Sequence, residues 1–153
     1  MHHKDLSVFK DGNIEFPSVL TIGWLSPERA YSKGVVADSV IQQLKRISGG
    51  KDAYDARSNT MRGAIQCKLC DDFRLQNPSE LWIESITEGE YYIAPELIIH
   101  YIEDHHYKPP EAFLSAVEQI DLNKPFSGQD IEEQLMKQVG YSDLPVNRPD
   151  NIL

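Results

Sequence analysis

Two cysteines and two histidines constrain this chain more than any other feature of its sequence. Cys67 and Cys70 form a C-x-x-C, and His100 and His105 form an H-x-x-x-x-H further along the chain. Two thiolates and two imidazoles at such spacings are typical of a closed tetrahedral zinc site. We therefore predict that a Zn²⁺ ion joins the turn carrying the cysteines to the helix carrying the histidines.

The spacing of the histidines leaves one ligand open to an alternative. His100 and His105 are more than one helical turn apart, so they face the same side only if the last turn of the helix loosens. Spacings of three to five residues between histidines occur in zinc fingers. His106 is the alternative to His105, and the spacing favours His105.

Four protein ligands leave no position for water or substrate, so the pattern predicts a structural ion and no catalytic one. Two other interpretations of the cysteines stay open: a pair of ordinary thiols, or a redox pair, although redox pairs normally begin a helix in a βαβ unit. Three carboxylates near the histidines, Glu96, Glu103 and Asp104, are candidates for orienting the ligand rings or for general bases. On exposed helix turns, however, carboxylates are usually only solvated.

Length, composition and charge bound the class of protein. A chain of 153 residues, with 41% hydrophobic and 25% charged residues, is typical of one globular domain. The polar N-terminus, without the apolar core of a signal peptide, and the absence of a long apolar stretch predict a cytoplasmic protein. A single close pair of cysteines cannot form a secreted disulfide framework, which agrees with a reducing compartment.

The formal net charge of −9 bears on the partners. A Cys2His2 zinc site leaves this charge unchanged, because two thiolates cancel the ion. An acidic surface repels phosphate backbones, and the basic stretches, Lys45-Arg46 and residues 57–62, are thin. The sequence therefore disfavours nucleic acid and is compatible with a basic protein partner.

Hydrophobic periodicity and turn residues predict a single α+β domain with short antiparallel hairpins, a finger-like zinc unit and about four helices. The predicted core includes Val40, Leu44, Leu97, Tyr101 and Phe113. The expected elements are an irregular arm at 5–17, a strand at 19–25, a helix at 37–48, a loop at 51–59, hairpin arms at 62–66 and 72–75, a second hairpin from 81–86 and 91–93, helices at 95–105, 111–120 and 127–139, the last ended by Gly140, and an extended tail at 143–153.

Several short motifs resemble a family of small bacterial proteins without an assigned activity. They are Asp5-Leu6-Ser7, Gly23-Trp24-Leu25, the C-x-x-C, and a long A-P-x-L-I-x-H-Y-I-x-x-H-x-Y-x-P-P motif at 94–110, followed by a helix with Phe113. His106 stands where the family pattern has a small residue such as glycine, and this also favours His105 as the ligand. The resemblance implies a bacterial source and a zinc-finger-like site. The resemblance covers residues 5–120. We predict one domain, 1–153, with 5–120 as its core and 121–153 as a C-terminal helix and tail.

Three functions follow as hypotheses. The first is a non-enzymatic, zinc-stabilised protein that acts through protein–protein contact, of the immunity or inhibitor kind. The second is a zinc-dependent enzyme with Glu96 or Glu103 as the base, which requires one protein ligand to be missing so that water can bind. The third is nucleic-acid binding through the finger-like unit, against which the net charge argues.

Overall fold

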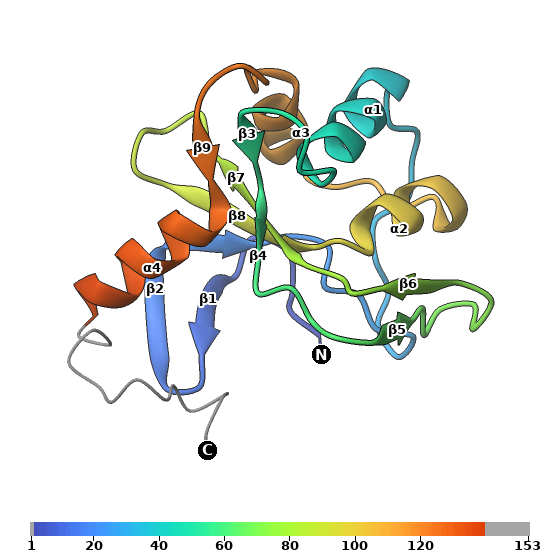
Figure 1. Cartoon of the computed structure of the whole chain (residues 1–153). Helices are drawn as coiled ribbons and strands as arrows, with labels where there is room; N and C mark the ends of the chain where they lie inside the picture. Colours follow the sequence, from blue (N-terminus) through green and yellow to red (C-terminus); the bar gives the residue numbers. More distant parts are fainter. Residues whose placement is uncertain (1, 140–153) are drawn as a thin grey trace.

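A five-stranded sheet forms the centre of the fold in the computed structural model, which describes residues 2–139 (Figure 1). In spatial order its strands are β1 (Val8–Asp11), β2 (Ile14–Thr21), β8 (Tyr91–Pro95), β7 (Glu80–Glu84) and β4 (Arg57–Ser58). β2 and β8 run parallel, and the other neighbouring strands are antiparallel. The β7–β8 hairpin agrees with the hairpin predicted at 81–86 and 91–93.

The N-terminal part of the sheet corrects two predictions. The expected irregular arm at 5–17 is instead the β1–β2 hairpin, turned at Gly12 with φ of 63° and irregular in register between Val8 and Phe9. The strand predicted at 19–25 begins earlier and ends at Thr21. The register irregularity obscures the alternation that marks a strand in sequence, which explains the error.

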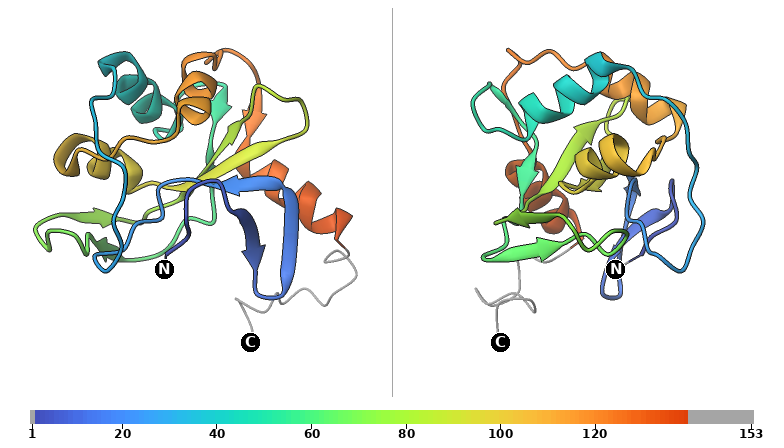
Figure 2. Two further views of the ribbon diagram at one scale, coloured as in Figure 1. Left: turned by 180° about the vertical axis from the view of Figure 1, so that it is seen from behind. Right: turned by 90° about the vertical axis from the view of Figure 1, so that its right-hand side faces the viewer.

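The helices lie on opposite faces of this sheet (Figure 2). α1 (Asp38–Ile47), α2 (Ile98–His105) and α3 (Glu111–Glu118) pack on one face, and α4 (Gly128–Gln138) packs on the other. Along β7, Leu81 and Ile83 face the first three helices, whereas Trp82 faces α4. This alternation divides the apolar side chains between two clusters, because successive residues of a strand point to opposite faces.

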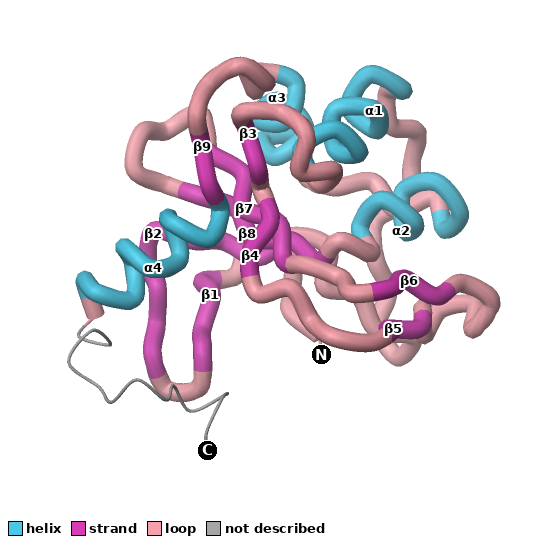
Figure 3. The backbone as a smooth tube through the Cα atoms, in the orientation of Figure 1, coloured by secondary structure: helices cyan, strands magenta, loops and turns pink. Residues whose placement is uncertain are grey.

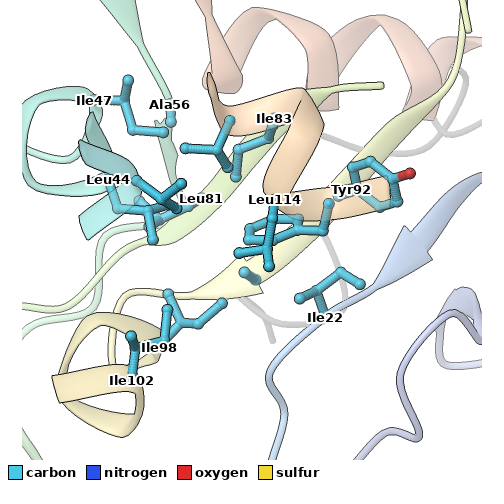
Figure 4. Packing of buried hydrophobic residues seen from close by; sticks show 14 of the residues in the cluster. Ile22, Leu44, Ile47, Ala56, Leu81, Ile83, Tyr92, Ile98, Ile102 and Leu114 are labelled. Carbon is cyan, nitrogen blue, oxygen red and sulfur yellow. The ribbon is translucent and has the colours of Figure 1, made fainter. Parts of the chain in front are cut away.

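The larger cluster contains all five residues predicted for the core, and Figure 4 shows part of it, including Leu44, Ile47 and Ile98. Leu44 and Ile47 of α1 and Ile98 of α2 are fully buried in it. Burying a Leu or Ile side chain contributes about 1.5–3 kcal/mol relative to leaving it exposed. The fold therefore has an extensive apolar core, most of whose residues come from the main sheet and its helices.

The helix predictions are confirmed apart from their ends. α4 is capped as predicted by Ser127, whose hydroxyl accepts a hydrogen bond from the backbone N–H of Asp130 at 3.1 Å. α2 is shorter than the predicted 95–105, because Pro95 ends strand β8 and does not begin the helix. Gly140 and the tail predicted at 143–153 lie outside the described residues.

Two small sheets complete the fold. β3 (Tyr54–Asp55) pairs with β9 (Phe126–Ser127), and the rings of Tyr54 and Phe126 stack with centroids 4.2 Å apart. The loop predicted at 51–59 is therefore wrong, since it contains β3 and β4. β5 (Ala64–Gln66) pairs with β6 (Arg74–Gln76), as predicted, and this hairpin lies beside α2 (Figure 3).

The fold class is α+β, a single domain with four helices in residues 2–139. Within that range, none of the helices has the length and apolar character that crossing a bilayer requires.

Candidate metal centre

The tip of the β5–β6 hairpin carries both cysteines. The backbone N–H of Cys67 donates to the carbonyl of Phe73 at 2.9 Å, which closes the tip, and the N–H of Asp71 donates back to the carbonyl of Cys67 at 2.9 Å. The N–H of Asp72 lies 3.4 Å from the sulfur of Cys70. These contacts fold the chain tightly between the two cysteines, so that both sulfur atoms point towards α2.

The two histidines lie on α2 and at its end. His105 is the last residue of the helix, and His106 follows it in the left-handed conformation, with φ of 57°. The N–H of Tyr107 then donates to the carbonyl of Tyr101 at 3.1 Å. Ending the helix in this way is a common C-terminal arrangement, and His105 here shares a side of the helix with His100.

The structure brings all four predicted ligand residues together. One ligand atom from each of Cys67, Cys70, His100 and His105 lies within 4.8 Å of the others. The sulfur of Cys67 is 3.5 Å from Nε2 of His105, and the sulfur of Cys70 is 3.5 Å from Nε2 of His100. A tetrahedral zinc ion with bonds of about 2.3 Å to sulfur and about 2.0 Å to nitrogen places these atoms about 3.5 Å apart. The cluster therefore has the dimensions of a metal site.

His106, the alternative ligand, is exposed and takes no part in the cluster. His105 is half-buried and lies with its ring centroid 4.9 Å from that of His100, nearly perpendicular to it. The site residue favoured by the spacing is thus the one that the fold brings to the cysteines.

Two aromatic rings cover the cluster. Phe73 stacks on His100, with centroids 4.1 Å apart and planes inclined by only 9°. The ring centroid of Tyr101 lies 6.3 Å from those of His100 and His105, and burial and then the negative charges of Cys67 and Cys70 raise the pKa of Tyr101 to about 12. Sequence reasoning did not single out Phe73, because nothing in the C-x-x-C pattern distinguishes a ring beside the tip of the hairpin from any other hairpin residue.

The three candidate carboxylates have different surroundings. Oδ2 of Asp104 lies 2.9 Å from Nδ1 of His100, although the ring N–H does not point directly at it. Glu103 instead forms an ion pair with Lys45 at 2.9 Å. Only Asp104 is in contact with a ligand ring.

Glu96, the third carboxylate, accepts a hydrogen bond from the backbone N–H of Ser79 at 2.9 Å. Burial raises the pKa of Glu96, because the charged form loses hydration. Glu96 also lines a cavity of about 140 Å³ beside His100.

Burial also sets the protonation of the cluster. It raises the pKa of the Cys67 thiol against the opposing effect of the backbone N–H groups of Leu69 and Cys70. It lowers the pKa of His105, and the neighbouring charge of His100 adds to this effect. Both shifts favour the neutral forms. A bound divalent cation favours the charged thiolate of Cys67 instead, because metal coordination requires the deprotonated sulfur.

The fold and the site together define an α+β domain with a partly buried Cys2His2 cluster that has the geometry to hold a metal ion. The chain belongs to the family described as "Domain of unknown function (DUF7919)", whose model matches residues 1–118. That range includes all four residues of the cluster. Comparisons with curated proteins and with solved structures gave no match.

Proposed function

We propose that this protein binds one structural Zn²⁺ ion and acts, without catalysing a reaction, through contacts with another protein in a bacterial cytoplasm. The zinc ligands of the proposal are Cys67, Cys70, His100 and His105. The observation that carries the zinc proposal is the pair of 3.5 Å sulfur–nitrogen distances, which fit tetrahedral coordination.

The nature of the ligands supports a structural role. Two thiolates and two imidazoles complete a tetrahedron, and two thiolates neutralise the charge of the ion, which lowers its Lewis acidity. The ion would connect a short hairpin, which has little core of its own, to a helix packed on the main sheet. The carboxylates proposed as bases have other partners, Lys45 for Glu103 and the amide of Ser79 for Glu96.

The partner proposal rests on charge. The net charge of −9 favours rapid, salt-dependent association with a basic surface. A basic protein inhibited or neutralised by this chain, as in toxin–immunity pairs, is the partner class that this charge suits best.

Zinc content tests the first part of the proposal. We expect one zinc ion per chain by elemental analysis, and after exchange for Co²⁺ the absorption bands of a tetrahedral sulfur–nitrogen site. Cys70→Ser should lose most of the metal. His106→Ala is the matched control, because His106 adjoins a ligand but lies outside the cluster. A protein without stoichiometric metal, or equal metal loss in both variants, would overturn the zinc proposal.

Reconstitution tests the second part. A protein captured by the zinc-loaded chain is to be purified and its affinity measured by calorimetry at low and high salt. We expect a basic partner whose affinity falls as salt rises, by screening of opposite charges. A salt-independent complex, or the failure of every captured protein to bind once purified, would contradict the proposal.

A further inference from the structure

A second concave site, lined by none of the four residues of the metal cluster, lies where the N-terminal segment crosses the loop that follows β2. This cavity has a volume of about 390 Å³. Ligand pockets for small molecules are typically about 300–1,000 Å³. The side chains around it are His2, His3, Lys4, Asp5, Leu25, Arg29, Ala30, Tyr31 and Ser32.

The lining is basic, although the protein as a whole carries a net charge of −9. Lys4 and Arg29 are exposed at the rim, and neither forms an ion pair within the part of the chain that the structure describes. His2 and His3 add two imidazoles. The positive groups thus converge on one cavity without an internal counter-ion at the rim.

Asp5 is the one carboxylate among the described residues that line the cavity, and it is already satisfied. Its Oδ1 accepts the backbone N–H of Gly23 at 2.9 Å, and its Oδ2 accepts the hydroxyl of Tyr107 at 2.7 Å. These bonds hold the carboxylate in the wall, so that it does not pair with Lys4 or Arg29.

His2, one of the lining residues, has a buried ring nitrogen without a hydrogen-bond partner. Nδ1 of His2 is inaccessible to solvent and makes no hydrogen bond among the described residues. A buried polar atom without a partner costs about 1–3 kcal/mol, and such atoms call for an explanation. Burial, followed by the positive charge of His2, lowers the pKa of the neighbouring His3, which agrees with a positive potential at this position.

The walls of the cavity are fixed by bonds to other parts of the fold. The N–H of His3 donates to the carbonyl of Trp24 at 3.1 Å. The hydroxyl of Tyr31 donates to the carbonyl of His105 at 2.9 Å, and the hydroxyl of Ser32 donates to the carbonyl of Lys108. These bonds hold His3, Tyr31 and Ser32 in place, whereas the side chains of Lys4 and Arg29 are exposed at the rim.

We propose that this cavity binds the phosphate group of a small phosphorylated organic molecule. A phosphate monoester carries about −1.5 to −2 charges and three acceptor oxygens. It therefore suits a guanidinium, an ammonium and two imidazoles better than a ligand with a singly charged carboxylate does. The cavity is larger than a phosphate ion requires, and Leu25, Ala30 and Tyr31 supply an apolar wall for the organic part. The proposal does not depend on the identity of the metal or on a protein partner.

Calorimetry with four probes tests the proposal on the zinc-loaded full chain. The probes are phenyl phosphate, inorganic phosphate, benzoate and phenol. We expect phenyl phosphate to bind most tightly, inorganic phosphate more weakly, and benzoate and phenol least. Equal affinity for phenyl phosphate and inorganic phosphate would contradict an organic ligand, and equal affinity for benzoate would contradict phosphate recognition. The absence of binding at millimolar concentrations would overturn the site.

Charge-neutral variants locate the binding. Arg29→Gln and Lys4→Gln should each weaken phenyl phosphate binding roughly tenfold, since each loses a charge-assisted hydrogen bond. Arg62→Gln and Lys51→Gln are matched controls, because both residues are exposed and lie outside the cavity. An equal loss in the controls would show general charge attraction and refute the site.

An NMR titration gives an independent readout that does not depend on a substitution. We expect phenyl phosphate to shift the imidazole signals of His2 and His3 more than those of His100 and His105, of which His105 is linked to the cavity only through its backbone carbonyl and Tyr31. Shifts confined to the latter pair would place the phosphate at the metal cluster and overturn the proposal.

Discussion

The hydroxyl of Tyr107 donates a hydrogen bond of 2.7 Å to Oδ2 of Asp5, 102 residues earlier in the chain. The other oxygen of this carboxylate accepts the backbone N–H of Gly23. Asp5, Gly23 and Tyr107 stand in three of the short motifs singled out in the sequence, Asp5-Leu6-Ser7, Gly23-Trp24-Leu25 and the long motif at 94–110. One carboxylate therefore ties the N-terminal segment, the end of β2 and the segment after α2 to one another.

Tyr107→Phe tests the importance of this bond. Tyr107 is fully buried, and removal of its hydroxyl leaves a carboxylate oxygen of Asp5 without its donor. A hydrogen bond to a charged group contributes about 1.5–3 kcal/mol. We expect the free energy of unfolding, measured with urea, to fall by about that amount.

Tyr91→Phe is the control for this substitution. Its hydroxyl makes no hydrogen bond among the described residues, and its side chain is only half-buried. We expect a change within about 0.5 kcal/mol, as for surface substitutions in general. Similar losses in both variants would show that the hydroxyl of Tyr107 contributes nothing through Asp5.

The metal cluster could be predicted from the sequence because its information is local. Each pair of ligands, Cys67 with Cys70 and His100 with His105, lies within one turn or one helix end, so the spacing limits how far apart the two residues of a pair can lie. The contact between the cysteine pair and the histidine pair depends on the fold. Because the chain has only two cysteines, however, no other pair of thiolates was available for a zinc site. The stacking of Phe73 on His100 could not be predicted, since it depends on how the β5–β6 hairpin packs against α2.

The parts of the fold that sequence reasoning missed depend on contacts between distant residues. β3 and β4 contain two residues each, too few to show a periodicity, and they are strands only because Phe126 and Leu81 lie opposite them. β2 pairs in parallel with β8, about 70 residues later in the chain. The hydrophobic pattern within either strand does not indicate which strand it pairs with. Helices, by contrast, carry their own period and were found.

Removal of zinc should lower the stability of the protein without unfolding it completely. A ligand present at a hundredfold excess over its Kd stabilises the folded state by about 2.7 kcal/mol. For a domain of this size we expect the melting temperature to fall by about 5–10 °C on chelation or in Cys70→Ser. The apolar core around Leu44 and Ile98 remains, because it lies in the main fold.

Circular dichroism with and without a chelator measures this change. In Cys70→Ser the chelator should have little further effect, and His106→Ala should behave as the unchanged protein. A melting temperature that neither chelation nor Cys70→Ser alters would show that the cluster contributes nothing to folding.

Asp104→Asn should weaken zinc binding through His100. A carboxylate next to the second nitrogen of a ligand imidazole orients the ring and raises its basicity, and loss of such a partner typically costs 10–100-fold in metal affinity. Asp104 lies 2.9 Å from Nδ1 of His100, but its side chain is 64% exposed, so we expect the lower end, about tenfold.

Glu103→Gln is the matched control for Asp104→Asn, since Glu103 precedes Asp104 on the same helix but pairs with Lys45. Chelator competition measures both variants. Equal affinities in Asp104→Asn and the unchanged protein would exclude this role for Asp104. If the protein catalysed a zinc-dependent hydrolysis that was lost in Glu103→Gln with folding intact, the ion would be catalytic and not structural.

Zinc affinity should fall as the pH falls. Burial raises the pKa of the Cys67 thiol, so in the metal-free protein at neutral pH this sulfur holds a proton that zinc must displace. Each protonated thiol that loses its proton on binding changes the apparent affinity by about tenfold per pH unit, and two thiols by about a hundredfold. His105 adds to this dependence only at lower pH, because its pKa is lowered. Chelator competition between pH 7 and 8 should therefore show at least the tenfold change in affinity per pH unit that Cys67 alone contributes; an affinity independent of pH would show that the thiols do not bind the ion as thiolates.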